Sequence, residues 1–200
     1  MLRGRRPRPA RRSISRSGIA PARWYISRSA ARSSAAFSTS RKGALMAELV
    51  RQQHLDADVG YHGFGFQESD DGDILAPFPD DFADEVFLNA FPGRLDIYSA
   101  GHTHTASVTV AVWDGPPAAH DRVQWDEQAE ADYDSASGEV AVWSMSLGRA
   151  DEVITLADSG GLWRVRVSCT GRAVAARLSE EEGTGHGVEK YLVQFWPRTA

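Results

Sequence analysis

Two histidines separated by one residue form the fragment of this sequence best suited to chemistry. Gly101–Thr105 reads Gly-His-Thr-His-Thr, which places His102 and His104 at positions i and i+2. Side chains at this spacing leave the same face of a β-strand, where two imidazoles could share one metal ion. A metal site needs further ligands, and no spacing fixes any of the other histidines near this pair. The sequence therefore predicts no metal or other cofactor, and His102 and His104 stand as the ligands to test first.

Two other fragments carry reactive or ligating side chains. Ser69–Asp73 holds oxygen ligands suited to calcium, but it lacks the full loop spacing and the distal bidentate Glu of a helix-loop-helix site. Cys169 is the one cysteine of the chain, which excludes an intramolecular disulfide. It shares the apolar parity of Leu162–Cys169 and lacks a local catalytic signature, so a buried thiol is expected. The sequence predicts no catalytic residue, and an enzyme is not expected.

An acidic face is the remaining candidate site. From Val123 to Asp134 apolar and polar residues alternate, with Trp125 and Tyr133 on the apolar parity. Alternation this regular favours a strand, although a helix capped by Asp126 is the alternative because Ala, Glu and Gln favour helices. The other parity carries the carboxylates that we expect to bind a partner: Asp126, Glu130, Asp132 and Asp134.

These four carboxylates allow two interpretations. On one side of a strand their potentials add, which would complement a basic surface such as the DNA-binding cleft of a nuclease. The alternative is an ordinary solvated strand face, whose charges discourage pairing between the edges of two sheets. The sequence leaves both interpretations open.

The elements that position these residues are strands. Period-two patterns recur about every 8 to 15 residues, with turn residues between them. The predicted strands are 59–66, 95–98, 107–113, 123–134, 139–147 with a bulge, 153–156, 162–169 and 188–196. No strong helical pattern of more than about ten residues separates them. The pattern predicts an all-β fold, a single antiparallel β-sandwich or barrel-like domain, over residues 46–200.

Charge divides the chain at the start of this domain. Residues 1–45 hold 12 of the 22 Lys and Arg and none of the 27 Asp and Glu, which leaves residues 46–200 with a net charge of −17. Such an acidic domain is expected to avoid nucleic acid and anionic membranes and to attract a basic protein partner. No apolar run approaches the roughly 20 residues of a membrane-spanning helix, and cytoplasmic localisation is expected.

The basic extension, residues 1–45, is rich in Arg and Ser and poor in large apolar side chains, so it is expected to be disordered. Three explanations remain open for it. It resembles a mitochondrial presequence in composition, which would make the protein mitochondrial. It could be translated upstream DNA, with Met46 as the true start, or a basic arm that binds nucleic acid.

A series of residues between Val123 and Pro197 resembles competence protein J, the inhibitor of a DNA-entry nuclease. The residues are Trp125–Ala129, Tyr133, Gly138, Val140, Gly161–Val165 and Tyr191–Val193. Trp163–Val167 and the closing Tyr191–Pro197 also resemble uncharacterised bacterial proteins, many of them from actinobacteria. These positions are mainly core positions and include no catalytic motif. The resemblance implies a small β protein that acts by binding another protein, such as a nuclease or a toxin.

The sequence thus supports two functions. The first is a non-enzymatic binding protein, an inhibitor or immunity-type partner of a basic protein, which acts through the four carboxylates. The alternative is a β-sandwich or barrel that binds a small ligand or a metal through His102, His104 and the adjoining loop.

Overall fold

The structure, a computed structural model, describes residues 46–69, 85–119, 123–181 and 183–199. Within these ranges the strands are β1 (Leu49–Val59), β2 (Gly63–Glu68), β3 (Leu88–Phe91), β4 (Arg94–Tyr98), β5 (His104–Trp113), β6 (Glu127–Ser135), β7 (Glu139–Ser144), β8 (Gly148–Thr155), β9 (Gly161–Thr170) and β10 (Lys190–Pro197). A single helix, α1 (Arg172–Glu180), lies between β9 and β10. The basic extension and Asp70–Asp73 of the acidic fragment Ser69–Asp73 lie outside the described residues.

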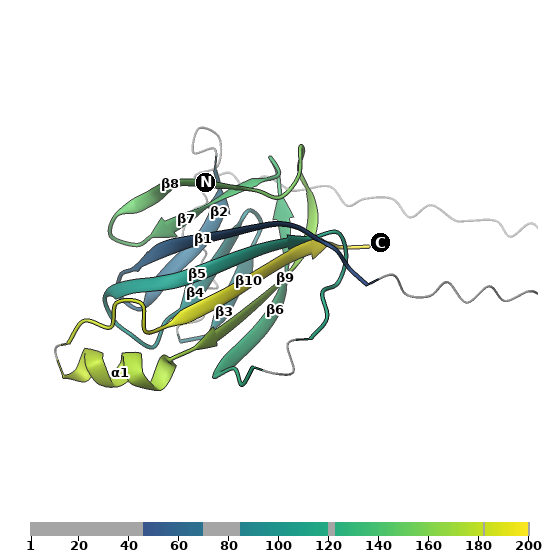
Figure 1. The fold of residues 1–200 in the computed structure, drawn as a ribbon. Helices are drawn as coiled ribbons and strands as arrows, with labels where there is room; N and C mark the ends of the chain where they lie inside the picture. Colours follow the sequence, from purple (N-terminus) through teal and green to yellow (C-terminus); the bar gives the residue numbers. More distant parts are fainter. Residues whose placement is uncertain (1–45, 70–84, 120–122, 182, 200) are drawn as a thin grey trace, which may run out of the picture. The chain divides into compact units, whose positions relative to one another are not determined.

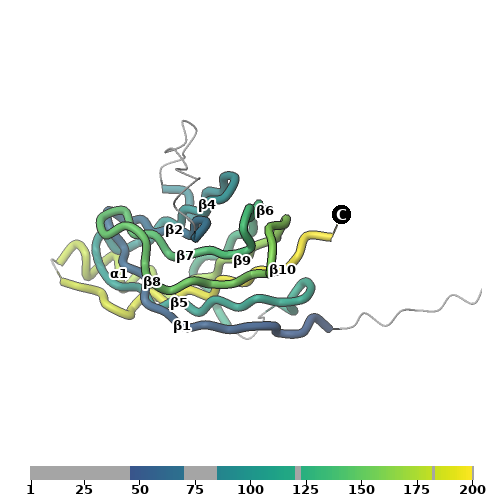
Figure 2. Tube along the Cα trace, turned by 90° about the horizontal axis from the view of Figure 1, so that it is seen from above, coloured from purple at the N-terminus to yellow at the C-terminus, as the bar shows by residue number. Residues whose placement is uncertain are grey.

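The strands form two five-stranded sheets. One has the order β1-β5-β10-β9-β6, and the other has the order β3-β4-β2-β7-β8. Figure 1 shows β1, β5, β10 and β9 side by side, and Figure 2 shows β1 and β5 in a different layer from β2 and β4. The paired strands are antiparallel except β5 and β10, which run parallel, while β10 is antiparallel to β9 on its other side. The predicted all-β sandwich is confirmed.

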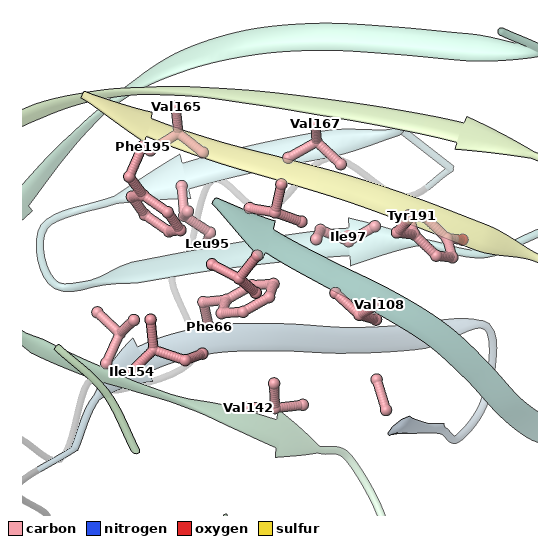
Figure 3. Packing of buried hydrophobic residues seen from close by; sticks show 14 of the residues in the cluster. Phe66, Leu95, Ile97, Val108, Val142, Ile154, Val165, Val167, Tyr191 and Phe195 are labelled. Atoms are coloured by element: carbon pink, nitrogen blue, oxygen red, sulfur yellow. The ribbon is translucent and has the colours of Figure 1, made fainter. Parts of the chain in front are cut away.

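Alternation of apolar residues builds the core between the sheets. Val108, Val110 and Val112 of β5 face the same interior as Tyr191, Val193 and Phe195 of β10, and each is at most 2% exposed. The opposite sheet supplies Phe64, Phe66, Leu95, Ile97, Val140 and Val142. Figure 3 shows Val108, Tyr191 and Phe195 of the first sheet in the same interior as Phe66, Leu95, Ile97 and Val142 of the second. Burial of this apolar area is the main force that holds the sheets together.

The two sheets are joined at their corners by short turns. A two-residue turn at Tyr61 and His62 leads from β1 in one sheet to β2 in the other, and residues 136–138 lead from β6 to β7. Glu68, which is 3% exposed, braces the second corner by accepting hydrogen bonds from the backbone N–H groups of Ala136 and Ser137. A hydrogen bond also joins the edge strands of the two sheets, since Arg51 of β1 donates to the carbonyl oxygen of Thr155 of β8.

Several predicted elements differ from the observed ones. Residues 123–134 form a strand, β6, and not the alternative helix, but the strand begins only at Glu127. The predicted strand 59–66 is interrupted by the Tyr61–His62 turn, and the long strand before it, β1, was missed because most of its side chains are exposed and polar. The segment 139–147 contains the predicted irregularity, between Ala141 and Trp143, and its strand ends at Ser144.

Candidate functional site

The turn between β1 and β2 has an unusual backbone. Tyr61 and His62 both adopt the left-handed conformation, with φ of 53° and 66°. Gly60 and Gly63 exchange backbone hydrogen bonds of 3.1 and 3.0 Å across them, which closes a two-residue turn with φ positive at both central positions. Such turns prefer Asn-Gly or Gly-Gly, and a left-handed side-chain-bearing residue costs roughly 1–2 kcal/mol. Strain of this kind is typical of functional sites.

Aromatic and imidazole rings gather at this turn. The ring of His62 stacks on Tyr98 at 5.3 Å between centroids and meets the edge of His102 at 4.9 Å. Tyr61 contacts His102 edge to face at 5.4 Å, and its side chain is 74% exposed. We call Tyr61, His62, Tyr98 and His102 the ring cluster. Its contacts offset part of the strain of the turn.

A pocket of about 220 Å³ opens beside the ring cluster. It is lined by Tyr61, His62, Gly63, Phe64, Glu85, Val86, Asn89, Asp96, Ile97, Tyr98 and Met145. Glu85 is the third left-handed non-glycine residue, with φ of 65°, so all three such residues among those described line this pocket. Asp96 forms a two-pronged ion pair with Arg94, at 2.6 and 2.8 Å.

The loop from Ser99 to Thr103 is held tightly behind the ring cluster. The backbone N–H of His62 donates to the carbonyl oxygen of His102 at 2.9 Å, and that of Ser99 donates to the carbonyl oxygen of His62 at 2.8 Å. The N–H of His102 donates to Ser179 Oγ on α1. These bonds fix the position of the loop relative to the turn, so the rings are preorganised.

Beneath the loop lies a buried polar group that we call the Glu189 cluster: Ser99, His104, Glu189 and Tyr191. Each of these side chains is at most 4% exposed. Glu189 accepts hydrogen bonds from Ser99 Oγ (2.5 Å), the Ala100 N–H (3.0 Å) and the Tyr191 hydroxyl (3.0 Å), and lies 3.2 Å from His104 Nε2. Burial by itself would raise the pKa of Glu189, but these donors outweigh it and lower the pKa.

The contacts of Ser99, His104 and Glu189 do not form a nucleophilic triad. A catalytic histidine uses one ring nitrogen for the nucleophile and the other for the carboxylate. Here Nε2 of His104 faces both Ser99 Oγ, at 2.9 Å, and Glu189, while Nδ1 has no hydrogen-bond partner among the described residues. The cluster is also closed to solvent. Its geometry suits the support of the loop above it.

The predicted histidine pair is split by the structure. His104 points into the Glu189 cluster and is buried, whereas His102 is exposed on the loop and joins the ring cluster. The alternation of β5 could have revealed this, because His104 shares the parity of Val108, Val110 and Val112. Glu189 likewise shares the parity of Tyr191, Val193 and Phe195. Within the described ranges no group of three or more His, Cys, Asp or Glu could hold a metal ion.

The predicted acidic face is largely neutralised by arginines. Glu130 pairs with Arg166 at 2.7 Å and with Arg164 at 3.3 Å. Asp132 pairs with Arg164 at 3.0 Å and with Arg198 at 2.8 Å. Burial opposes the ionisation of Glu130, but Arg166 and Arg164 outweigh it and lower its pKa. The arginine partners come from β9 and from the residue after β10, which the alternation of residues 123–134 could not indicate.

The other two carboxylates of this face differ from each other. Asp126 precedes β6, and its Oδ2 accepts hydrogen bonds from the N–H groups of Gly171 (2.7 Å) and Arg172 (3.0 Å). It therefore satisfies N–H groups at the start of α1, as an N-cap side chain would. Asp134 is exposed and makes no side-chain hydrogen bond or ion pair with any described residue. It is the most available of the four predicted partner-binding carboxylates.

Cys169 is fully buried, as predicted. Burial, followed by the nearby charge of Glu189, raises the pKa of its thiol to about 12. The thiolate, which is the reactive form, is therefore disfavoured at neutral pH.

Among the described residues, no helix has the length and apolar character that crossing a membrane requires.

Over the residues that the structure describes, two five-stranded sheets and one short helix define the class of fold, and one solved structure shares this fold. The crystal structure of ComJ from Bacillus subtilis, described as an inhibitor of the DNA degrading activity of NucA, is similar over 77% of this chain and 100% of that chain, with a TM-score of 0.51 and 13% identity. A protein described as crocagin biosynthetic gene J matches 78% of this chain and 100% of that one, with a TM-score of 0.45 and 15% identity.

No protein-family model and no curated protein sequence matches the chain. The likeness to ComJ shows a shared fold, and it confirms the resemblance to competence protein J that the sequence indicated.

Proposed function

We propose that the folded domain is a non-enzymatic binding protein, an inhibitor or immunity-type partner of a basic protein such as a nuclease or a toxin. The observation that carries the proposal is the net charge of −17 on residues 46–200. This charge attracts cationic surfaces and repels nucleic acid. The fold of ComJ, a protein described as an inhibitor of a DNA-degrading activity, supports the same class of function.

The acidic face of β6 is the first surface that we propose for this partner. Glu130 and Asp132 are already paired with arginines, so a basic protein meets there a mixed surface and not a purely negative one. Asp134 adds an exposed charge without an intramolecular partner among the described residues. Charges at the rim of an interface mainly accelerate encounter. We expect the face to affect the association rate more than the dissociation rate.

A second candidate function is small-ligand binding in the pocket beside the ring cluster. The observation that favours it is the pocket itself, at which the strained turn places His62 and Tyr61. Its volume of about 220 Å³ is below the roughly 300–1,000 Å³ of pockets that hold drug-sized ligands. Intact mass under native conditions would reveal a bound ligand or ion and would favour this function.

The test of the leading proposal is affinity capture by the immobilised full-length chain from a lysate of the source organism. We expect the retained protein to be basic, to elute as ionic strength rises, and to lose an enzymatic activity, such as DNA degradation, when the chain is added. Capture of acidic proteins alone, or a captured enzyme whose activity the chain leaves unchanged, would contradict the proposal.

Two matched variants then test the surface. In one, Asp126, Glu130, Asp132 and Asp134 become Asn or Gln; in the control, the exposed Glu48, Asp151, Glu152 and Asp158 are changed in the same way. Both lose four charges, so a difference between them reports position and not net charge. We expect slower association and a weaker salt dependence for the first variant only. Equal association rates for the two variants would remove β6 from the interface.

A further inference from the structure

The pocket beside the Tyr61–His62 turn has the chemistry of a site for a cation. We propose that it seats one lysine or arginine side chain of the basic partner. The inference rests on the proposed function and adds to it the place and the kind of contact. It concerns a surface apart from β6, because the lining residues come from the β1–β2 turn, β2, β3, β4, the β7–β8 turn and the segment before β3.

The walls of the pocket are mostly apolar and aromatic, and they include two carboxylates. Tyr61 and Tyr98 line the pocket, and a cation over the face of a tyrosine ring is attracted by the ring quadrupole. Glu85 and Asp96 provide carboxylates, and the described lining residues include no lysine or arginine. Asp96 is bound by Arg94, whereas Glu85 is exposed and forms no ion pair with the described residues. Glu85 is therefore the available counter-charge.

His62 lines the pocket, and one of its ring nitrogens can accept a hydrogen bond. Its Nδ1 lies 3.2 Å from the carbonyl oxygen of Ser99, which can only accept, so the hydrogen bond requires a proton on Nδ1. In the neutral ring Nε2 then carries the lone pair. A lysine ammonium or an arginine guanidinium has only N–H donors, which match this acceptor as well as the carboxylate of Glu85.

The size and rigidity of the site favour a single side chain. The volume of about 220 Å³ is small for a drug-sized molecule and leaves room for one long side chain. The left-handed turn and the hydrogen bonds from the Ser99–Thr103 loop hold the rings in place before binding. A preformed site avoids the ordering of side chains on binding, which would otherwise weaken a contact of this size.

The experiment is a two-dimensional ¹H–¹⁵N NMR titration of the full-length protein with capped single residues. The probes are the Nα-acetyl amides of arginine, of citrulline, which has nearly the same shape without the charge, and of norleucine, which is apolar. We expect arginine to shift the amide signals of Tyr61, His62 and Tyr98 with a dissociation constant on the order of 10 mM. Citrulline and norleucine should bind at least about tenfold more weakly if charge carries the contact.

Three variants locate the effect. Glu85→Gln should weaken arginine binding about fivefold, since it removes the available counter-charge. The double variant Tyr61→Asn with His62→Gly should abolish binding while keeping the turn, because Asn-Gly suits its backbone. Glu127→Gln, which removes an exposed carboxylate at the start of β6, is the control and should bind arginine unchanged.

Each other outcome overturns the inference. Equal shifts with citrulline would mean that charge is not recognised, and tighter binding of norleucine would make the pocket an apolar site. Shifts confined to β6 and β9, or none at this turn with arginine, would mean that the pocket takes no cationic side chain. None of these results bears on affinity capture, so the binding function could stand while the pocket proposal fails.

Discussion

Glu189 and Glu130 are both carboxylates that face an arginine, but Glu189 is buried and Glu130 is partly exposed. Glu189 is fully buried and accepts its hydrogen bonds from a serine, a tyrosine and a backbone N–H. Glu130 lies on the outer face of β6 and faces Arg164 and Arg166 in partial contact with water. A buried charge is stable only when its surroundings are fixed, whereas a solvated charge tolerates exchange of partners.

This difference separates structural carboxylates from those available for recognition. The Glu189 cluster supports the Ser99–Thr103 loop and, through it, the ring cluster at the pocket. At the centre of the β6 face, arginines of the same fold neutralise Glu130 and Asp132. The side chain of Asp134 has no ion-pair partner among the described residues. Acidic sequence composition alone therefore overstates the negative potential of β6. The functional test has to distinguish paired from unpaired carboxylates.

The largest effect is expected for Glu189→Ala. The change leaves the Tyr191 hydroxyl and the N–H of Ala100 without their acceptor in a site closed to water, and it removes the carboxylate that Arg172 and His104 face. Loss of a buried charged partner typically costs about 3–5 kcal/mol. Urea denaturation of the variant measures it, with Glu152→Ala on the exposed surface of β8 as the control. A loss no greater than that of the control would mean that the cluster does not hold the fold together.

Acid should remove the same contribution. The pKa of Glu189 is lowered from its usual 4.5. A carboxyl group whose pKa is depressed by folding stabilises the protein above its unfolded pKa, and this stabilisation is lost as pH falls through the folded value. The difference in unfolding free energy between the native chain and Glu189→Gln should be constant near neutral pH and shrink below pH 4.5. A difference that stays constant into acid would refute the assignment.

Gly101→Ala probes the packing of the cluster without touching its charge. A Cβ at this position would lie 2.5 Å from His104 Cδ2 and 2.7 Å from Nε2, so the buried imidazole must move. Forcing extra volume into a packed site typically costs about 1–3 kcal/mol. The control is Gly115→Ala, whose added Cβ would meet its nearest neighbour at 3.8 Å. Thermal unfolding compares them, and similar losses would show that the loop adapts freely.

The sequence predicts the repeating parts of the fold better than its special contacts. Alternation in Leu162–Cys169 and near Tyr191, Val193 and Phe195 identifies strands and buried faces because one sheet face must exclude water. It fails for β1, where one face contributes little to the core and the other is solvated. The parallel pairing of β5 with β10 joins strands far apart in the sequence, and no local pattern indicates it.

The candidate site was harder to predict than the fold for a physical reason. The ring cluster joins residues of the β1–β2 turn to residues of the loop before β5, and no local pattern connects them. Left-handed φ at Tyr61 and His62 contradicts the usual turn preference for glycine and asparagine. His104 and Glu189 could have been placed in the interior by extending the parity of β5 and β10. Their mutual contact depends on the pairing of those strands.

The smallest effects on stability are expected on β6, and they sharpen the comparison. Glu130→Gln weakens ion pairs with Arg164 and Arg166 that are partly exposed, and pairs of this kind contribute about 0.2–1 kcal/mol. Asp134→Asn removes no contact with the described residues and should change stability by less than about 0.5 kcal/mol.

Yet the unpaired charge of Asp134 adds more to the potential that a basic protein meets, since arginines already offset that of Glu130. Asp134→Asn should therefore slow partner association more than Glu130→Gln does. It should also be the more stable of the two variants. Denaturation and association rates at low salt, measured on both variants, decide it. The opposite order in the association rates would mean that the arginine-paired centre of β6 contacts the partner directly.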